Sequence, residues 1–187
     1  MVNIIIIHGA FGNPEENWFP WIKNELENLG HNVYIPKFPT PENQNLESWR
    51  KIFKDYEQYL NEDCIVIGHS LGPAFLLNIL ENINFKIKGA FFVAGFLNLL
   101  GNNTFDSINK TFIDNKFNFE KIRNNCEKFF VYHSDNDPYI PIKFGEELAE
   151  KVNGNFVLVE NAGHFNEISN YIKFNLLLED IKKLLNK

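Results

Sequence analysis

Six short apolar runs spread along the chain constrain its fold more than any other feature of the sequence. The strands that they predict are Asn3–Ile7, Asn32–Ile35, Cys64–Ile67, Gly89–Val93, Phe129–Tyr132 and Asn155–Val159. Within each run, Ile, Val and Phe residues follow one another instead of alternating with polar residues. Such runs are typical of strands that are buried on both faces of a parallel sheet.

Helical patterns occupy the intervals between these runs. The predicted helices are Pro20–Leu29, Leu46–Leu60, Leu71–Ile83, Phe119–Cys126, Ile142–Val152 and Glu167–Leu185. In the first of them Ile22, Leu26 and Leu29 share one face, Pro20 suits the first turn, and Gly30 suits the C-terminal cap. Because strand and helix alternate throughout, the sequence predicts an α/β protein with three α/β/α layers and a six-stranded parallel sheet.

Length and composition are those of an ordinary globular protein. No internal repeat, linker or domain boundary interrupts the chain, so residues 1–187 are expected to form a single domain with a sizeable core. Hydrophobic residues make up 44% of the chain and charged residues 22%, as in average globular proteins. The net charge of −6 argues against nucleic acid or an anionic membrane as the main partner.

Targeting and redox features favour a cytoplasmic protein. The apolar run Ile4–Ile7 is too short to span a membrane, and no cationic segment precedes it as in a signal peptide. Cys64 and Cys126 form neither a C-x-x-C pair nor a metal-binding spacing, and we expect both to be buried, reduced thiols. The sequence predicts no membrane association, no metal site and no cofactor.

The segment Gly68-His69-Ser70-Leu71-Gly72 fits the pattern G-x-S-x-G. This pattern is typical of a sharp turn between a strand and a helix, in which the serine has a strained backbone and an exposed hydroxyl. The two glycines allow neighbouring backbone to pass close by. The alternative is that Ser70 caps a helix, so the function of the turn depends on the residues at the ends of the other strands.

Polar residues come after the other strands, at the edge where parallel sheets bind ligands. His8-Gly9-Ala10-Phe11-Gly12 comes after the first strand, Ser134-Asp135-Asn136-Asp137-Pro138 after the fifth, and Ala162-Gly163-His164-Phe165-Asn166 after the sixth. A serine, an acid and a histidine thus come in the chain order Ser, Asp, His, which α/β-hydrolases use.

These residue types supply the parts that a serine nucleophile needs. An imidazole, His164, takes the proton of Ser70 during attack, and a carboxylate holds the imidazole in one tautomer. Backbone N–H groups must then bind the oxyanion. We expect one from Leu71 at a helix start, where the helix dipole also favours negative charge, and the other from Ala10, with Phe11 as the alternative. His164 could instead be a loop histidine bonded to a backbone carbonyl.

Two acids compete for the carboxylate role. We favour Asp137, because the spacing Asp137-x-x-Ile140-Pro141 fixes a turn and then begins a helix. Asp135 would then be a turn residue that bonds nearby backbone N–H groups. Among the remaining histidines, His8 and His69 are expected to orient loops and His133 to pack. His31 lies in a helix-to-strand connection and is assigned no role.

The substrate-binding residues are expected to be Phe11, Trp18 and Phe96. Trp18 belongs to an aromatic cluster after the first loop, which could equally be core. Phe96 begins an apolar stretch within residues 95–128 that is too short for a folded lid domain. That stretch could form one wall of a shallow pocket beside Ser70, or its side chains could simply complete the core.

Four blocks of the sequence together resemble a known family: HGAFGNPEENWFPWI, VIGHSLG, SDNDPYIP and AGHFN. The chain is similar to the YdeN-like small serine hydrolases related to retinoblastoma-binding protein nine, within the α/β-hydrolase superfamily. The resemblance implies a compact α/β-hydrolase fold without a large lid, and a triad of Ser70, Asp137 and His164. It also implies esterase- or peptidase-like activity. The Leu-x-Cys-x-Glu segment that binds a retinoblastoma-type pocket is present at neither Cys64 nor Cys126, so this partner is not expected.

The sequence therefore predicts a metal-independent serine hydrolase that forms an acyl-enzyme from small esters or amides. Two alternatives remain open. One is a protein-binding module on a hydrolase scaffold, since fold alone does not determine function. The other is a thioesterase or acyltransferase.

Overall fold

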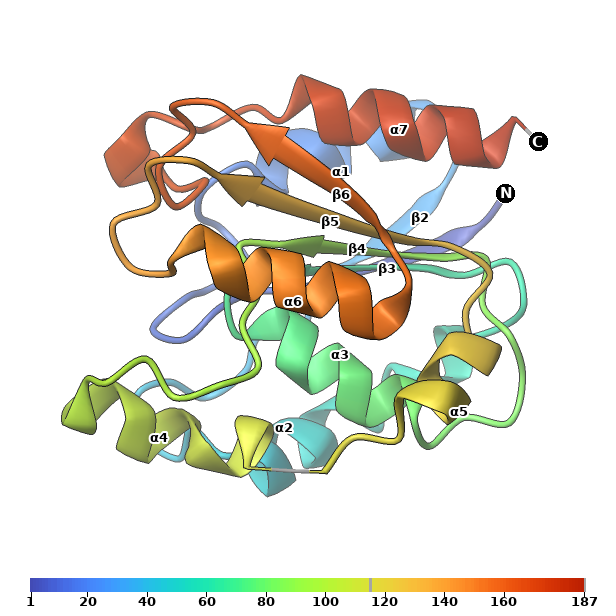
Figure 1. The fold of residues 1–187 in the computed structure, drawn as a ribbon. Coiled ribbons are helices and arrows are strands. Elements are labelled where there is room, and N and C mark those ends of the chain that lie inside the picture. The colour runs from blue at the N-terminus through green and yellow to red at the C-terminus, as the bar shows by residue number, and fades with distance from the viewer. Residues whose placement is uncertain (115, 187) are drawn as a thin grey trace.

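A parallel sheet forms the centre of the computed structural model, which describes residues 1–114 and 116–186 (Figure 1). Its strands are β1 (Asn3–Ile7), β2 (Asn32–Tyr34), β3 (Ile65–His69), β4 (Gly89–Val93), β5 (Phe129–Ser134) and β6 (Asn155–Val159). They lie in the order β2-β1-β3-β4-β5-β6, and every neighbouring pair is parallel. All six predicted strands are confirmed, with bounds that differ by at most two residues.

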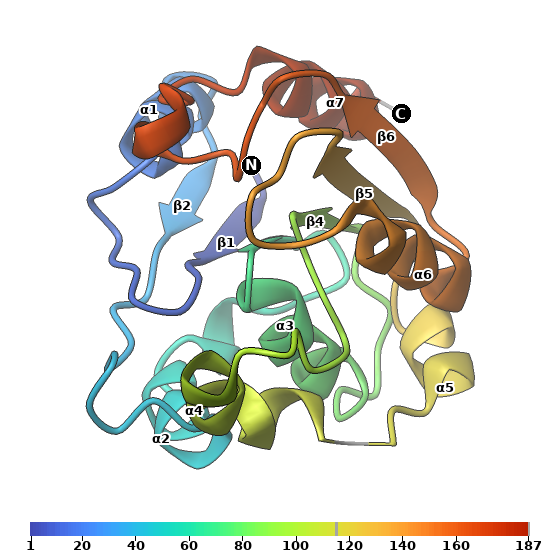
Figure 2. The same cartoon turned by 60° about the vertical axis from the view of Figure 1, so that its left-hand side comes forward.

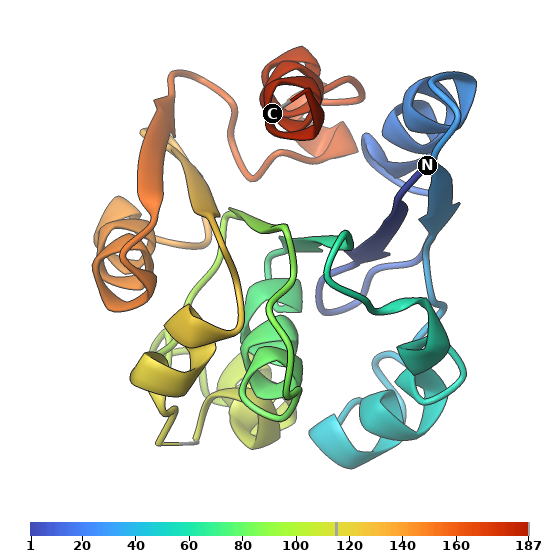
Figure 3. The same cartoon turned by 90° about the vertical axis from the view of Figure 1, so that its right-hand side faces the viewer.

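Helices cover both faces of this sheet (Figures 1 and 3). One face carries α1 (Phe19–Asn28) and α7 (Asn175–Leu185). The other carries α2 (Leu46–Phe53), α3 (Gly72–Leu80) and α6 (Ile142–Val152), and α4 (Asn103–Ile113) and α5 (Phe119–Asn124) pack against α3. The predicted three-layer α/β/α architecture is confirmed.

The side chains of β1 explain why its apolar run is unbroken. Ile4 and Ile6 pack with α1 and α7 in one buried cluster, whereas Ile5 and Ile7 pack with α2 and α3 in the other. All four are fully buried. Since burying one such side chain stabilises the fold by about 1.5–3 kcal/mol, both faces of the strand hold the sheet in place.

Two predicted helices are each divided into an α-helix and a 3-10 turn. Leu46–Leu60 ends as α2 at Phe53 and continues as a 3-10 turn at Glu57–Tyr59, where i→i+3 hydrogen bonds replace the helical pattern. Glu167–Leu185 is likewise divided into a 3-10 turn at Glu167–Ser169 and α7, because Asn170 adopts a left-handed conformation with φ of 55°. Gly30 follows α1 with φ of 85°, which confirms the predicted cap.

The two cysteines are free and buried, as predicted. Burial raises the pKa of both the Cys64 and the Cys126 thiol to about 12. Thiols in such surroundings are protonated at neutral pH and therefore unreactive. Among the helices of residues 1–114 and 116–186, none has the length and apolar character needed to cross a membrane.

The strand order reverses between β1 and β3, whose carboxyl ends lie side by side. Figure 2 views this edge, with the loops after the strands and helix α4 turned toward the reader. In the described part of the segment after β4, residues 94–114 and 116–128, the chain forms α4 and α5 and no large lid, as the sequence predicts. Open α/β sheets bind ligands at such a reversal point.

Candidate active site at the carboxyl edge of the sheet

Ser70 lies in the sharp turn between β3 and α3. Its φ of 57° is in the left-handed region, which non-glycine residues rarely adopt. A Cβ atom on Gly68 would lie 2.6 Å from Pro73 N, and one on Gly72 would lie 2.5 Å from the Ile7 carbonyl oxygen. Both positions therefore require glycine, and the G-x-S-x-G pattern has a steric cause.

The loop after β1 packs directly against Ser70. A Cβ atom on Gly9 would lie 2.8 Å from the Ser70 Cβ, so the two backbones approach closely. His8 fixes this loop, because its Nδ1–H donates to the Gly9 carbonyl (2.8 Å) and its Nε2 accepts from Phe38 N–H (3.1 Å). Burial lowers the pKa of His8, in keeping with this neutral tautomer.

The backbone N–H groups near Ser70 distinguish the two candidate oxyanion donors. Phe11 N–H already donates to Thr40 Oγ1 at 2.7 Å. Neither Ala10 nor Leu71 N–H has a hydrogen-bond acceptor within the part of the chain that the structure describes. Leu71 also stands at the N-cap of α3. The geometry therefore favours Ala10 over Phe11 as the partner of Leu71.

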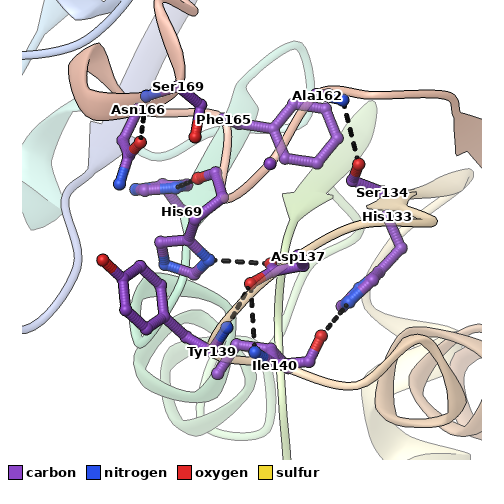
Figure 4. Close-up of polar contacts among 12 residues, drawn as sticks. His69, His133, Ser134, Asp137, Tyr139, Ile140, Ala162, Phe165, Asn166 and Ser169 are labelled. Atoms are coloured by element: carbon purple, nitrogen blue, oxygen red, sulfur yellow. Dashed lines mark hydrogen bonds and ion pairs between the residues drawn. The ribbon is translucent and has the colours of Figure 1, made fainter.

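Asp137 and His164 form a buried pair. His164 Nδ1 lies 2.8 Å from Asp137 Oδ2, and the side chains of His164 and Asp137 are 10% and 0% exposed. The other carboxylate oxygen, Oδ1, accepts from Tyr139 N–H (2.9 Å) and Ile140 N–H (3.0 Å), as Figure 4 shows.

The electrostatics of this pair fix its protons. Burial alone would raise the pKa of Asp137, but the hydrogen bond and charge of His164 and the two backbone N–H groups hold it below its usual value. The carboxylate therefore carries no proton, and His164 Nδ1–H is the donor. This leaves Nε2 of His164 as the nitrogen able to accept a proton.

Asp135 does not contact the imidazole. Three consecutive side chains at the end of β5 accept hydrogen bonds from three consecutive backbone N–H groups of the loop that leads to His164. Figure 4 shows the bond between Ser134 and Ala162. The pairs are Ser134 with Ala162 (3.0 Å), Asp135 with Asn161 (2.7 Å) and Asn136 with Gly163 (2.8 Å). Asp135 thus bonds backbone 26 residues away, not a nearby turn as the sequence suggested.

His69 connects the serine turn with the histidine loop. Its Nε2–H donates to the His164 carbonyl at 2.8 Å, and the two rings are 4.9 Å apart. Burial, and then the nearby His164, lower the pKa of His69 to about 3, so the ring is neutral. Among the described residues no hydrogen bond joins the Ser70 hydroxyl to His164, and such catalytic bonds are often long in the absence of substrate.

Two of the three expected substrate-binding side chains are buried. The Trp18 side chain is fully buried, and its Nε1–H donates to the Phe165 carbonyl at 3.0 Å. Phe96 is also fully buried, with its ring 5.9 Å from that of Phe105. Neither presents surface to a ligand, so both expectations are corrected in favour of core packing. Phe11 is 54% exposed next to Ala10.

Tyr139, which the sequence patterns did not assign to the site, lies beside His164. Tyr139 is 53% exposed, and its ring stands edge-on to the His164 ring, with centroids 5.1 Å apart. Asn17 and Glu167 exchange hydrogen bonds between backbone N–H and side chain at 2.9 and 3.0 Å. Tyr139 could have been found from its place two residues after Asp137. The contact between Asn17 and Glu167 could not have been found, because the two residues are 150 positions apart in the sequence.

The remaining histidines pack or orient loops. His133 is buried, and its Nε2–H donates to the Ile140 carbonyl at 2.8 Å, which closes the acid loop. His31 accepts from Val2 N–H at 3.4 Å, far along the chain from the candidate site. Across residues 1–114 and 116–186, no group of three or more His, Cys, Asp or Glu side chains is arranged to hold a metal ion.

The buried, neutral His69 predicts a pH dependence of stability. Its folded pKa of about 3 lies below its ordinary value of 6.5, so the unfolded chain binds more protons between these pH values. The free energy of unfolding should therefore fall as the pH drops below 6.5, by up to about 1.4 kcal/mol per pH unit for one proton.

Urea unfolding of the wild-type protein and of His69→Gln between pH 7 and 4.5 measures how steeply the free energy of unfolding changes with pH. The slope for the variant should be smaller by the equivalent of about one proton. Part of the slope should remain, because burial also lowers the pKa of His8 and His133. If the free energy of unfolding of the two proteins had the same dependence on pH, the lowered pKa of His69 would be contradicted.

Comparison with known proteins places this chain in a family. The profile of the serine hydrolase family matches residues 4–183. Hydrolase YdeN of Bacillus subtilis is 27% identical over 186 residues, which cover 98% of this chain and 96% of that protein. Serine hydrolase RBBP9 of Rattus norvegicus is 24% identical over 184 residues, which cover 97% and 94%.

Solved structures share the fold. The crystal structure of the ydeN gene product from B. subtilis superimposes with a TM-score of 0.93 at 26% identity and 100% coverage of both chains. Est1E from Butyrivibrio proteoclasticus, solved with ferulic acid bound, has a TM-score of 0.70 at 16% identity, covering 97% of this chain and 90% of that one. Since the family profile spans almost the whole described chain, this protein belongs to the serine hydrolase family, and it is a hydrolase with the α/β-hydrolase fold.

Proposed function

We propose that the protein hydrolyses small esters or amides through an acyl-enzyme on Ser70, with His164 as general base and Asp137 as its carboxylate partner. The observation that carries the proposal is the 2.8 Å bond between His164 Nδ1 and Asp137 Oδ2, next to the strained Ser70 turn. This bond leaves Nε2 of His164 available for the serine proton. We propose Ala10 and Leu71 N–H as the oxyanion donors.

Acylation begins when Ser70 Oγ attacks the substrate carbonyl carbon. As the C–O bond forms, the hydroxyl proton passes to His164 Nε2, and the carbonyl electron pair moves to the oxygen, where the two N–H groups stabilise the negative charge. Asp137 stabilises the imidazolium that results. When the tetrahedral intermediate collapses, the bond to the leaving group breaks, and His164 gives its proton to the departing alcohol or amine.

Deacylation repeats these steps with water as the nucleophile. His164 takes a proton from water while the water oxygen attacks the acyl carbon, and the proton then passes to Ser70 Oγ as the acid product leaves. No metal or cofactor takes part in either half of the proposed reaction, so EDTA should leave turnover unchanged. Loss of turnover in EDTA that zinc restores would contradict this mechanism.

The exposed aromatic rings suggest which part of a substrate lies where. Phe11 adjoins the proposed oxyanion donor Ala10 and is therefore proposed to contact the acyl group. Tyr139 adjoins His164, which protonates the leaving group, and is therefore proposed to contact that group. Since Phe96 is buried in the core and α4 adds no large lid, we propose that the site takes small substrates.

An acyl-chain series tests this substrate class. We expect kcat/KM for p-nitrophenyl esters to peak at short acyl chains and to decline as the chain lengthens, without activation at a lipid–water interface. The reason is that we propose a shallow site, since Phe11 and Tyr139 are more than half exposed and Phe96 is buried in the core. A steady rise in kcat/KM toward long acyl chains would contradict this.

Two additions to the substrate series test the thioesterase and acyltransferase alternatives. A thioester substrate tests for a thioesterase, and an added alcohol or amine that competes with water as acyl acceptor tests for an acyltransferase.

A second function class, a binding module on a hydrolase scaffold, predicts no turnover of any of these substrates. The pair of His164 and Asp137 favours the enzyme, because a binding surface has no need for a buried, oriented base. We propose the cytoplasm as its location, in line with the two reduced thiols.

A further inference from the structure

A chain of hydrogen bonds runs from the loop beside Ser70 to helix α4. Phe11 N–H donates to Thr40 Oγ1 (2.7 Å), and Thr40 Oγ1 donates to Gln44 Oε1. Gln44 Nε2 donates to Asn109 Oδ1 (2.6 Å), and Asn109 Nδ2 donates to the Phe105 carbonyl (2.9 Å). Each donor in this chain faces an acceptor, so all four hydrogen bonds can form at the same time.

The two amides at the far end of this chain are buried. The exposed fractions are 6% for Gln44 and 0% for Asn109. Buried amides stay in place because an unpaired polar group is costly there. Two buried amides at the α4 end thus hold the hydroxyl of Thr40 in one position, although Phe11 itself is exposed.

The backbone of Phe11 is strained, and the hydrogen bond from its N–H to Thr40 helps to hold it in place. Its φ of 59° lies in the left-handed region, where a phenylalanine is strained. Its ring also meets the Phe105 ring of α4, with centroids 6.3 Å apart. On the other side of Ala10, His8 Nδ1–H holds the Gly9 carbonyl. Ala10 is therefore anchored at both neighbouring residues, while its own N–H meets no acceptor among the described residues.

We propose that Thr40, Gln44 and Asn109 are positioning residues that aim the Ala10 N–H at the oxyanion, so that one side chain of α4, Asn109, helps to hold the loop beside Ser70. This inference rests on the proposed function, because it assigns a role within the same site. Thr40 Oγ1 at 2.7 Å and Gln44 Oε1 at 3.4 Å both accept from Phe11 N–H, so these two side chains together occupy one of two adjacent amides. The other amide, Ala10 N–H, is then the one proposed to face the substrate. Donors that are already oriented contribute most of the oxyanion stabilisation.

Thr40→Val tests the proposal, because valine has nearly the shape of threonine but lacks the hydroxyl. We expect kcat/KM for a p-nitrophenyl ester to fall by about tenfold, with KM changed less than about twofold, since oxyanion binding acts in the transition state. Affinity for a trifluoromethyl ketone, which forms a hemiketal oxyanion with the serine, should fall by the same factor. The pH midpoint of kcat/KM should not move, because the base is untouched.

Three further proteins complete the design. Thr40→Ser keeps the hydroxyl and should restore most of the lost activity. Thr104→Val makes the same chemical change at an exposed position of α4 and should behave as wild type. The double variant Gln44→Leu/Asn109→Leu removes both amides at once, so that neither buried amide is left without the other. It should lower kcat in the same way if circular dichroism shows a native fold.

The outcomes separate this inference from the proposed function. Wild-type activity that depends on Ser70, with Thr40→Val fully active or more active, would overturn the positioning role while leaving the hydrolase intact. Equal losses in Thr40→Val and Thr40→Ser would also overturn it. Absence of any Ser70-dependent turnover or ketone binding in the wild-type protein would overturn both.

Discussion

Ser70→Ala should lower kcat by a factor approaching ~10⁶, because a complete serine triad loses nearly all its chemistry with its nucleophile. His164→Ala should be about as damaging, since the serine hydroxyl then has no base. Both effects are measured as steady-state turnover of a short p-nitrophenyl ester. The variants should bind a substrate analogue with nearly unchanged affinity, because neither change removes the oxyanion loop.

The control for this prediction is the double variant Ser70→Ala/His164→Ala. If the two residues act as one unit, it should be no slower than either single variant. Additive losses would contradict a shared role in proton transfer. A Ser70→Ala protein with more than a few per cent of wild-type kcat would show that another group is the nucleophile.

Asp137→Asn should lower kcat by a factor of ~10⁴. The asparagine can still accept hydrogen bonds from Tyr139 and Ile140 N–H, so the acid loop should keep its shape. Its amide would turn an N–H toward His164 Nδ1, however, and would stabilise the tautomer in which Nε2 carries the proton. The base would then be unable to accept the Ser70 proton.

Asp135→Asn is the matched comparison, because the same change is made two residues away. The Asp135 Oδ1 atom accepts from Asn161 N–H, and an asparagine oxygen can do the same, so kcat should change by less than about tenfold. Thermal unfolding of both variants shows whether either loss reflects folding. If Asp135→Asn loses far more activity than Asp137→Asn while both remain folded, the assignment of the acid is wrong.

The parts of this structure that depend on local periodicity could be predicted from the sequence. Each face of β1 packs against a layer of helices, so every side chain of Ile4–Ile7 is apolar. This unbroken apolar run predicts a strand that is buried on both faces. The Ser70 turn was recognisable because Gly68 and Gly72 are required by backbone contacts close by in the fold. In both cases the constrained residues are neighbours in the sequence, so the constraint is visible as a short sequence pattern.

The parts that depend on distant partners could not be predicted. The break before α7 comes from the left-handed Asn170, which the apolar pattern of residues 167–185 does not reveal. Trp18 comes after the loop beside the site in sequence, but its indole turns inward to bond the Phe165 carbonyl. The role of Asp135 likewise depends on Asn161, which belongs to the loop of another strand.

The central claim is that Ser70 forms a covalent acyl-enzyme, and mass spectrometry of the native protein after fluorophosphonate treatment tests it most directly. The account predicts one adduct per chain, mapped by peptide sequencing to Ser70. The adduct should be absent in Ser70→Ala and strongly reduced in His164→Ala. An adduct on another residue, equal labelling of Ser70→Ala, or no adduct on the folded wild-type protein would contradict the account.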